Sequence, residues 1–491
     1  MAESLELLSS AEGGIARLRK LIRDLAVIGR LVEPPSNSPA WTWSTLGVEV
    51  LGMDSGWSPS CLDTPSRSTA VWAVLRTTAV QSLRYVPSEN KELPAALDPR
   101  PEAEVKVGDV LFTRAGPMNR VGISCLVDAT RPRLMLSDKI IRFRPRPDRL
   151  DGRFTALCLN AGATADYLEA AKSGMAASQV NISQAKLKAA PIPVPPMSEQ
   201  HRIVAKVDEL MALCDRLEAR QQDAEATHAR LVQALLDSLT QARDADEFHA
   251  CWQRLAEQFD TVFTTDGSVD SLKQMVMQLG VEGRLCAGGP RSAWQLKTIN
   301  EFCTVQGGIQ KTPLRAPVRH HFPYLRVANV QRGRIDVAQM ERYELAPDEL
   351  ERWRLNAGDL LIVEGNGSEA EIGRCAIWQG EVDNCVYQNH LMRVRPTGDD
   401  AVEYLALYLN SPVGTAHMRR LAITTSGLFN LSVGKIRSIP VELPPPAEQH
   451  RIVAKVTELL ALCDQLKARI TAARAKHAQL AEALVHTAVQ P

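Results

Sequence analysis

The sequence predicts an α+β protein in which two mixed α/β domains are separated by long antiparallel coiled-coil helices, with a pseudo-twofold internal repeat. Three observations predict this fold. A helical segment occurs twice, its apolar residues follow the spacing of a coiled coil, and short β-type runs fill the regions in between.

The repeated segment is nearly identical in its two copies. Residues 199–220 read EQHRIVAKVDELMALCDRLEAR and residues 448–469 read EQHRIVAKVTELLALCDQLKAR, which agree at 18 of 22 positions. A second pair of related segments, LRKLIRDLAVIGRL from Leu18 and LKQMVMQLGVEGRL from Leu272, lies upstream of each large domain. Each half of the chain is therefore read as a short helix, a large variable domain and a long helix.

The long segments have an apolar residue alternately every three and every four residues, which is the spacing of a coiled-coil seam. In the first copy the predicted seam is Val207, Leu210, Cys214, Leu217, Gln221, Ala224, His228, Leu231 and Leu235. In the second it is Val456, Leu459, Cys463, Leu466, Ile470, Ala473, His477, Leu480 and Leu484. Prolines precede each segment, as they often precede a helix, so we expect a helix over about 199–242 packed against its second copy.

The regions between the helices contain short runs typical of β-strands, separated by clusters of Gly, Pro and Asn. These runs are 110–113, 140–143, 324–327, 360–363 and 391–394. The expected organisation is an N-terminal helical segment (1–33), a first domain (34–197), a central helical spacer (198–286), a second domain (287–446) and a C-terminal helical spacer (447–491).

Composition excludes several classes of protein. The 491 residues include 57 basic and 57 acidic side chains, so the net charge is zero, and a DNA-binding protein that acts alone is usually basic. No apolar run is long enough to span a membrane, and no secretion signal is evident. Ten scattered cysteines without a CxxC pair indicate reduced, buried thiols and a cytoplasmic location.

Basic residues gather locally in this neutral chain, as contact with phosphate requires. Residues 302–335 contain no acid, and 131–153 contain eight bases against three acids. Arg suits guanine in the major groove, while Asn and Gln suit adenine. The candidate DNA-binding residues are Gln310, Lys311, Arg319, Arg326, Asn329, Gln331, Arg332, Asn430, Arg114, Arg120, Lys139 and Arg142.

Motifs for catalysis are absent from the sequence, so we expect a chain that is not an enzyme. No Asn/Asp-Pro-Pro-aromatic element of an adenine methyltransferase and no phosphate-binding GxxxxGK[ST] loop is present. Asp109 and Asp359 could suggest a nuclease, but no Asp/Glu-x-Lys element follows either, and we expect both to shape the turn that enters a strand. No metal site and no cofactor is expected in this chain.

The repeated EQHRIVAKV start, the LALCD helix, the LKQMVMQLGVEGRL segment and the run Phe322–Gln331 resemble the specificity subunits of Type I restriction-modification systems. The resemblance covers nearly the whole chain and is strongest in the helices. The first domain matches only by its position and by Gly108-Asp109-Val110-Leu111, and it lacks a clear counterpart of Leu325–Gln331.

The resemblance implies that both variable domains are target recognition domains, each of which reads half of a bipartite, asymmetric double-stranded DNA site. It implies that the helices fix the gap between the halves and dock two methyltransferase subunits. The partners, which include restriction and translocase subunits, would bring S-adenosylmethionine, ATP and Mg²⁺. Two alternatives remain open: a stand-alone regulatory or architectural DNA-binding protein, and a coiled-coil scaffold that does not contact nucleic acid.

Overall fold

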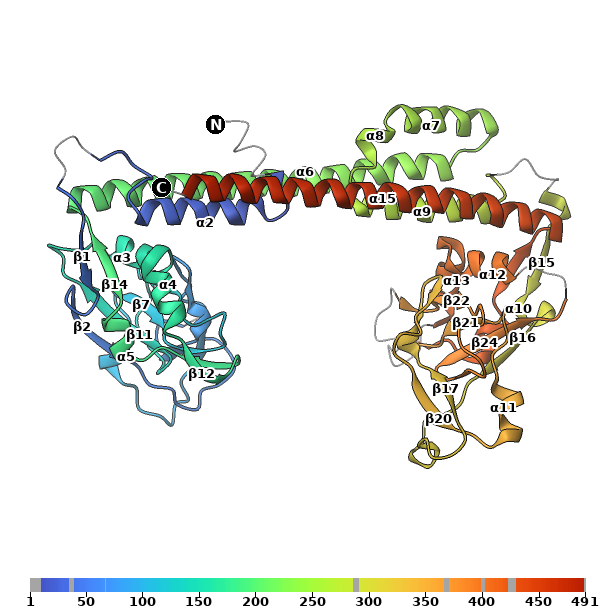
Figure 1. The fold of residues 1–491 in the computed structure, drawn as a ribbon, viewed down its shortest axis with the longest axis horizontal. Helices are drawn as coiled ribbons and strands as arrows, with labels where there is room; N and C mark the ends of the chain where they lie inside the picture. The colour runs from blue at the N-terminus through green and yellow to red at the C-terminus, as the bar shows by residue number, and fades with distance from the viewer. Residues whose placement is uncertain are drawn as a thin grey trace. The chain divides into compact units, whose positions relative to one another are not determined.

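The computed structural model describes residues 10–34, 39–66, 68–285, 291–365, 371–398, 402–422 and 430–489. They form two compact units, one within 1–223 and 474–491 and the other within 224–473. Each unit contains a mixed α/β domain and parts of long helices (Figure 1), which confirms the predicted α+β fold with two domains. No helix in the described ranges is long and apolar enough to cross a membrane.

The domain of the first unit is built on an antiparallel sheet with the order β2-β11-β7-β9. These strands are β2 (Val50–Ser55), β11 (Ile140–Pro145), β7 (Val110–Thr113) and β9 (Ser124–Leu126). A second sheet has β10 (Leu134–Met135) parallel to β3 (Ala73–Leu75), with β6 (Asn90–Glu92) antiparallel on the other side. A third small sheet joins β12 (Ser173–Ala176), β13 (Gln179–Asn181) and β8 (Ala115–Gly116).

The domain of the second unit has the same strand order in its two main sheets. The antiparallel sheet is β16 (Cys303–Gly307), β24 (Leu391–Pro396), β21 (Leu360–Val363) and β22 (Cys375–Ile377). The second sheet is β20 (Glu341–Glu344), β17 (His321–Leu325) and β23 (Val386–Tyr387), with β17 and β23 parallel. Because order and direction agree strand for strand, β7 corresponds to β21 and β11 to β24.

Smaller elements also correspond between the two domains. A two-residue turn joins β4 (Val80–Gln81) to β5 (Arg84–Tyr85), and another joins β18 (Val330–Gln331) to β19 (Arg334–Ile335). Two-stranded ribbons pair β1 (Thr42–Thr45) with β14 (Pro191–Val194), and β15 (Gln295–Thr298) with β25 (Pro440–Leu443). The short helices are α5 (Gln184–Lys188), α10 (Ile299–Phe302), α11 (Pro347–Trp353) and α14 (Val433–Arg437).

Two helices cover one face of the main sheet in each domain: α3 (Gly152–Leu159) and α4 (Gly162–Ala170), or α12 (Val402–Asn410) and α13 (Pro412–Ala422). In Figure 1 they lie between the strands and the long helix of their own unit. Phe154 and Leu157 of α3 share a buried cluster with Phe112 of β7 and Val207 of the long helix. Burial of these apolar side chains is the main force that joins sheet, helix pair and long helix.

The long helices are α6 (Met197–Thr240) and α15 (Pro446–Val489). Val207 and Cys214 are buried as the predicted seam requires. The predicted seam is wrong farther along, because Leu231 is 52% exposed while Val232, Leu236 and Leu239 are buried. A helix with 3.6 residues per turn drifts away from a strict seven-residue repeat, and this part of α6 packs on α7 and α9.

Leu480 of α15 departs from the seam in the same way as Leu231. It is 57% exposed, and its neighbour Ala481 is buried instead. The repeated seam therefore holds only in the first part of each long helix.

Each long helix begins at a Pro-Pro turn that a buried glutamine holds in place. Gln200 Nε2 donates to the carbonyls of Pro195 and Arg149 at 2.8 and 2.9 Å. At the corresponding place Gln449 Nε2 donates to the carbonyl of Pro444 at 2.8 Å. These bonds pair both the buried glutamine amide and the carbonyls before the helix, which gives the glutamine a structural role in both copies.

The short helices α2 (Gly14–Val27) and α9 (Asp266–Val281) pack on the long helices of the first and second unit respectively. Both end at a glycine with positive φ, Gly29 and Gly283, against which a tryptophan ring packs. A Cβ at either glycine would lie within 2.9 Å of the Trp41 or Trp294 ring. The insertion between α6 and α9 forms α7 (Ala245–Glu257) and α8 (Phe259–Val262).

Candidate nucleic-acid interface

Arg142 and Arg120, two of the predicted DNA-binding cations of the first domain, are used by the fold. Arg142 donates through Nε and Nη2 to Asp54 at 2.9 and 2.7 Å, and these hydrogen bonds raise the pKa of its guanidinium. The same side chain donates to the Glu104 carbonyl and is only 15% exposed.

Arg120 donates to main-chain carbonyls at 2.8 and 2.7 Å and to the Gln81 side chain at 3.1 Å. Neither Arg120 nor Arg142 has the free planar edge that bidentate recognition of guanine requires. Because the prediction that they bind DNA conflicts with these contacts, we leave both residues out of the proposed interface.

Two buried aspartates shape the turns before the central strands, as predicted. Asp109 accepts the Lys106 amide at 2.8 Å, and Asp359 accepts the Asn356 amide at 2.7 Å. Each carboxylate also binds an arginine of the neighbouring strand, Arg144 at 2.8 Å for Asp109 and Arg395 at 2.5 Å for Asp359. The hydrogen bond to Asp359 raises the pKa of Arg395.

The aspartates are therefore part of the scaffold of both domains, and no metal-binding group of His, Cys, Asp or Glu side chains occurs among the described residues. Eight of the nine described cysteines are buried, and Cys61 is half-buried. Burial raises the pKa of the Cys125 thiol to about 12, which keeps it protonated and unreactive at neutral pH.

Arg114 and Lys139 come together at the end of strand β7. The Arg114 amide donates to the Lys139 carbonyl at 2.9 Å, and the Arg114 carbonyl accepts the Ile182 amide at 2.8 Å. Lys139 is exposed, and Arg114 is half-buried, with a buried Nε that has no hydrogen-bond partner in the described part of the chain. Lys139 is thus open to a ligand, and Arg114 beside it is partly exposed.

In the second domain, Lys311 and Arg326 share one carboxylate. Glu341 on β20 accepts from Lys311 Nζ at 2.7 Å and from Arg326 Nη1 at 3.0 Å. The hydrogen bond from Lys311 is the main reason that the pKa of Glu341 is lowered, so this carboxylate is ionised at neutral pH. The group keeps a net positive charge of one, which suits contact with phosphate.

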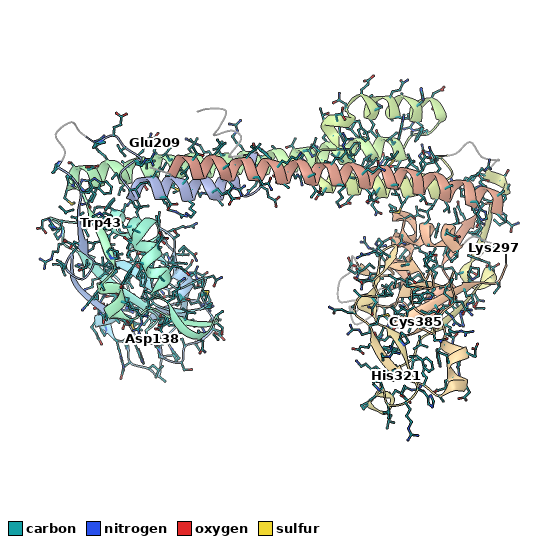
Figure 2. All side chains as sticks on the ribbon, in the orientation of Figure 1. Trp43, Asp138, Glu209, Lys297, His321 and Cys385 are labelled. Atoms are coloured by element: carbon teal, nitrogen blue, oxygen red, sulfur yellow. The ribbon has the colours of Figure 1, made fainter. Side chains whose placement is uncertain are left out.

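Gln310 and Arg319 lie near the same two strands, β17 and β20. The Gln310 carbonyl accepts Tyr343 Oη at 2.7 Å, and the Arg319 amide donates to Glu344 at 3.0 Å, while both side chains are exposed. His321, which begins β17, lies in the part of its domain that is away from α15 (Figure 2). The structure therefore gathers Gln310, Lys311, Arg319 and Arg326 on one part of the second domain.

Asn329 is not available for base recognition in this structure. Its Nδ2 donates to the carbonyls of Asp336 and Gln339 at 2.8 and 2.9 Å, and its Oδ1 accepts the Arg326 amide at 2.9 Å. The side chain is 4% exposed and holds the turn that follows β17. The prediction that Asn329 contacts DNA conflicts with this role, so it is left out of the proposed interface.

Gln331 and Arg332 occupy the hairpin β18–β19 and are separate from the Lys311 group. Gln331 Nε2 donates to the Ala328 carbonyl at 2.8 Å, and Arg332 Nη1 donates to Asn410 of α12 at 3.2 Å. Arg332 also lines a groove of about 750 Å³ formed with α9, α12 and α15 within the second unit. Asn430 is exposed at a third place, beside Glu364 and His390.

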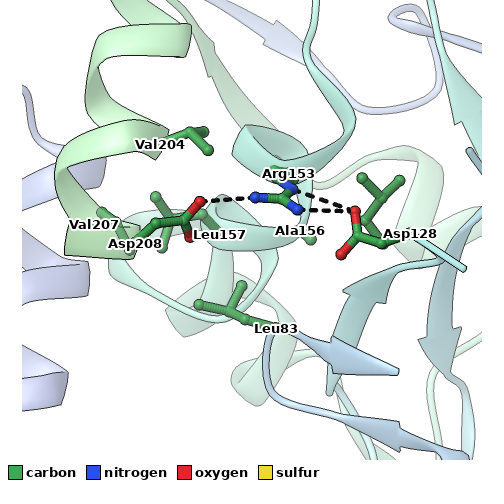
Figure 3. Close-up of a pocket in the computed structure, with 9 residues that line it drawn as sticks. Leu83, Asp128, Arg153, Ala156, Leu157, Val204, Val207 and Asp208 are labelled. Atoms are coloured by element: carbon green, nitrogen blue, oxygen red, sulfur yellow. Dashed lines mark hydrogen bonds and ion pairs between the residues drawn. The ribbon is translucent and has the colours of Figure 1, made fainter. Parts of the chain in front are cut away.

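The first unit has a corresponding groove of about 150 Å³ between α3, α6 and the tip of the β4–β5 hairpin. Arg153 of α3 bridges it, with Nη1 2.7 Å from Asp208 of α6 and Nη2 3.2 Å from Asp128 (Figure 3). In the second domain the corresponding helix position is Glu403, which lines the larger groove.

The first domain does contain a counterpart of Leu325–Gln331, although the sequence comparison did not find it. Residues 75–81, LRTTAVQ, follow β3 with a 3-10 turn and then enter the β4–β5 hairpin, as 325–331, LRVANVQ, follow β17 and enter β18–β19. The signal was the shared Leu-Arg and Val-Gln at a separation of 250 residues. It was weak because only four positions of this short stretch agree.

The two domains share one topology and carry different polar side chains at corresponding positions. The family model described as "Type I restriction modification DNA specificity domain" matches residues 96–228 and 291–473, which together exceed half of the chain. This chain therefore belongs to the family of Type I restriction-modification DNA specificity domains.

Curated relatives agree with this family. The Type I restriction enzyme EcoEI specificity subunit of Escherichia coli is 41% identical over 280 residues, which are 48% of this chain and 47% of that protein. The EcoKI specificity subunit of Escherichia coli (strain K12) is 28% identical over 306 residues, or 62% of this chain and 58% of that protein. The matched part thus spans about half of the length of these relatives.

A solved structure supports the fold. A chain from work on complex assembly and conformational transition of the type I R-M system covers 93% of this chain and 99% of its own length, with a TM-score of 0.54 and 17% identity. At this level of identity the likeness concerns the fold alone.

Proposed function

We propose that this chain is the non-catalytic specificity subunit of a Type I restriction-modification complex. Each recognition domain reads one half of a bipartite, asymmetric double-stranded DNA target, and the long helices fix the gap between the halves. The family match carries this proposal, because it occurs once in each half of the chain and covers much of a domain together with the first part of a long helix.

The partners in this proposal are two methyltransferase subunits, together with restriction and translocase subunits. The partners would supply S-adenosylmethionine, ATP and Mg²⁺. The neutral net charge fits a subunit whose partners add positive surface around DNA, and it disfavours a stand-alone DNA-binding protein. A scaffold without contact to nucleic acid would not need the exposed Lys139 beside a half-buried Arg114 at a strand end.

The long helices carry a feature that suits the docking of one partner twice. Leu213 of α6 is 42% exposed, and Leu462, at the corresponding place in α15, is 53% exposed. Their exposed neighbours are also the same in both helices: Ala205, Glu209 and Ala212 in one, and Ala454, Glu458 and Ala461 in the other. Small residues beside a leucine allow a partner helix to approach closely, and equal faces suit two copies of the same partner.

The experiment that tests the proposal is co-expression of the chain with the methyltransferase subunit encoded beside it, followed by single-molecule sequencing of the host DNA. The expected result is a new split, asymmetric methyladenine motif. A stable complex that methylates no DNA would contradict the proposed target reading, and the absence of any complex would favour the stand-alone DNA-binding alternative.

A further inference from the structure

Both recognition domains have a polar site at the end of a central strand, β7 or β21. The main chain of the site is alike in the two domains, but its side chains differ in charge. In the first domain it consists of Arg114, Lys139 and Asn181, and in the second of Glu364, His390 and Asn430. We call these residues the strand-end site of each domain.

Main-chain hydrogen bonds establish the correspondence residue by residue. Arg114 follows β7 and Glu364 follows β21, and each amide donates at 2.9 Å to the residue just before the neighbouring strand, Lys139 or His390. Each carbonyl accepts an amide from the residue after the asparagine, Ile182 at 2.8 Å or Leu431 at 2.7 Å. Three side chains from three segments are thus placed alike in both domains.

The side chains in the second domain form a group linked by polar contacts. Glu364 Oε2 lies 2.8 Å from His390 Nδ1, and among the described residues Glu364 Oε1 has only a 3.5 Å contact with Asn430 Nδ2. The Glu364 carboxylate is 16% exposed and the His390 ring is 55% exposed. Within the described part of the chain, the Oε1 atom is therefore an acceptor with spare capacity.

The Glu364 carboxylate limits which groups of DNA the site can bind. A glutamate repels the phosphate backbone, so a DNA contact at this point must go to a base edge. In the major groove a carboxylate accepts from an exocyclic amino group, as on cytosine N4. Lys435, whose Nζ donates to the Asn430 carbonyl at 3.0 Å, supplies positive charge for a phosphate nearby.

We infer that the strand-end site is a base-reading point of each domain, and that it selects a base with an amino group in the second domain and a guanine in the first. Arg114 provides the guanine contact because the residue is only half-buried and an arginine fork matches guanine O6 and N7. The inference rests on the proposed function, since it assumes that both domains read DNA.

The test uses the full chain assembled with its methyltransferase subunits and duplex libraries in which each position of the target is randomised in turn. Glu364→Gln keeps the shape of the side chain but removes its charge. We expect discrimination to fall about tenfold or more at one base pair of one half-site, and Arg114→Gln to do the same in the other half-site. Asp383→Asn, which changes another exposed carboxylate of the second domain, should leave discrimination unchanged.

Two results would overturn the inference. One is unchanged discrimination at every position in both variants, and the other is an equal loss of binding to all sequences, which marks a phosphate contact or a structural role. If the unmodified complex itself shows no discrimination at any position, the proposed function fails, and this outcome is distinguished before any variant is measured.

Discussion

The two recognition domains share their strand order but differ in the charges that they place at the same points of the fold. At the strand-end site the first domain has Arg114 and the second has Glu364. At the groove beside the long helix, Arg153 binds Asp208 in the first unit, whereas Glu403 lines an open groove in the second. The comparison teaches that topology is fixed by buried residues that both domains keep, while charged positions near the surface are free to diverge.

The largest expected effect concerns assembly, where the two halves should behave alike. Leu213→Glu and Leu462→Glu should each remove one of two methyltransferase subunits, and the double variant both, because burial of a charge against an apolar partner costs about 2 kcal/mol or more. Native mass spectrometry of the complex measures the stoichiometry. Arg216→Gln is the matched control, since it introduces the residue that the second helix carries at Gln465.

Retention of two partner copies by the double variant would show that the leucines do not anchor the docking. Loss of both copies in each single variant would contradict two independent and equal sites.

The next prediction compares the effect on stability of a cation that the fold uses, Arg142, with that of a cation proposed to bind DNA, Arg326. Arg142→Ala should lower the free energy of unfolding by about 1.5–3 kcal/mol, because it removes charge-assisted hydrogen bonds from a side chain that is 15% exposed. Arg326→Ala should change stability by less than about 1 kcal/mol, because its ion pair is partly exposed. Denaturant unfolding of the two variants tests this difference.

For DNA binding, we expect Arg326→Ala to have a larger effect than Arg142→Ala. Arg326→Ala should cost about 1–3 kcal/mol on the preferred sequence if the side chain reads a guanine. Equal weakening on all sequences would instead assign Arg326 to a phosphate.

The smallest expected effect on stability concerns the grooves beside Arg153 and Glu403. Arg153→Ala should destabilise the first unit by about 0.5–1 kcal/mol, because its ion pairs with Asp128 and Asp208 are about half exposed. Glu403→Ala, at the corresponding position, should change the free energy of unfolding by less than about 0.5 kcal/mol. Thermal unfolding of both variants compares the grooves, and a larger effect for Glu403 would contradict the account of the Arg153 bridge.

Much of the fold could be predicted because it depends on local pattern. The strands Val110–Thr113 and Leu360–Val363 are found where the sequence predicts them, and the long helix begins at Met197 and ends at Thr240 rather than spanning 199–242. The predicted seam is wrong at Leu231, because α7 and α9 pack on a neighbouring face of α6. The sequence alone does not show which face of α6 these helices cover.

The candidate site was harder to predict because composition does not separate the roles of like residues. Lys139 and Arg142 are three positions apart in one basic run, yet Lys139 is exposed and Arg142 binds Asp54. Glu364 is an acid, so it was not among the predicted DNA-binding residues, which are basic residues and amides. It becomes a candidate only because it occupies the position in the second domain that Arg114 occupies in the first.

The most direct test of the central claim exchanges residues 34–197 for the first recognition domain of another specificity subunit. The methylated motif of the resulting complex is then read by single-molecule sequencing. The account predicts that one half of the target changes completely while the other half and the gap between them stay the same. A change in both halves, or in neither, would contradict the claim that each domain reads its own half.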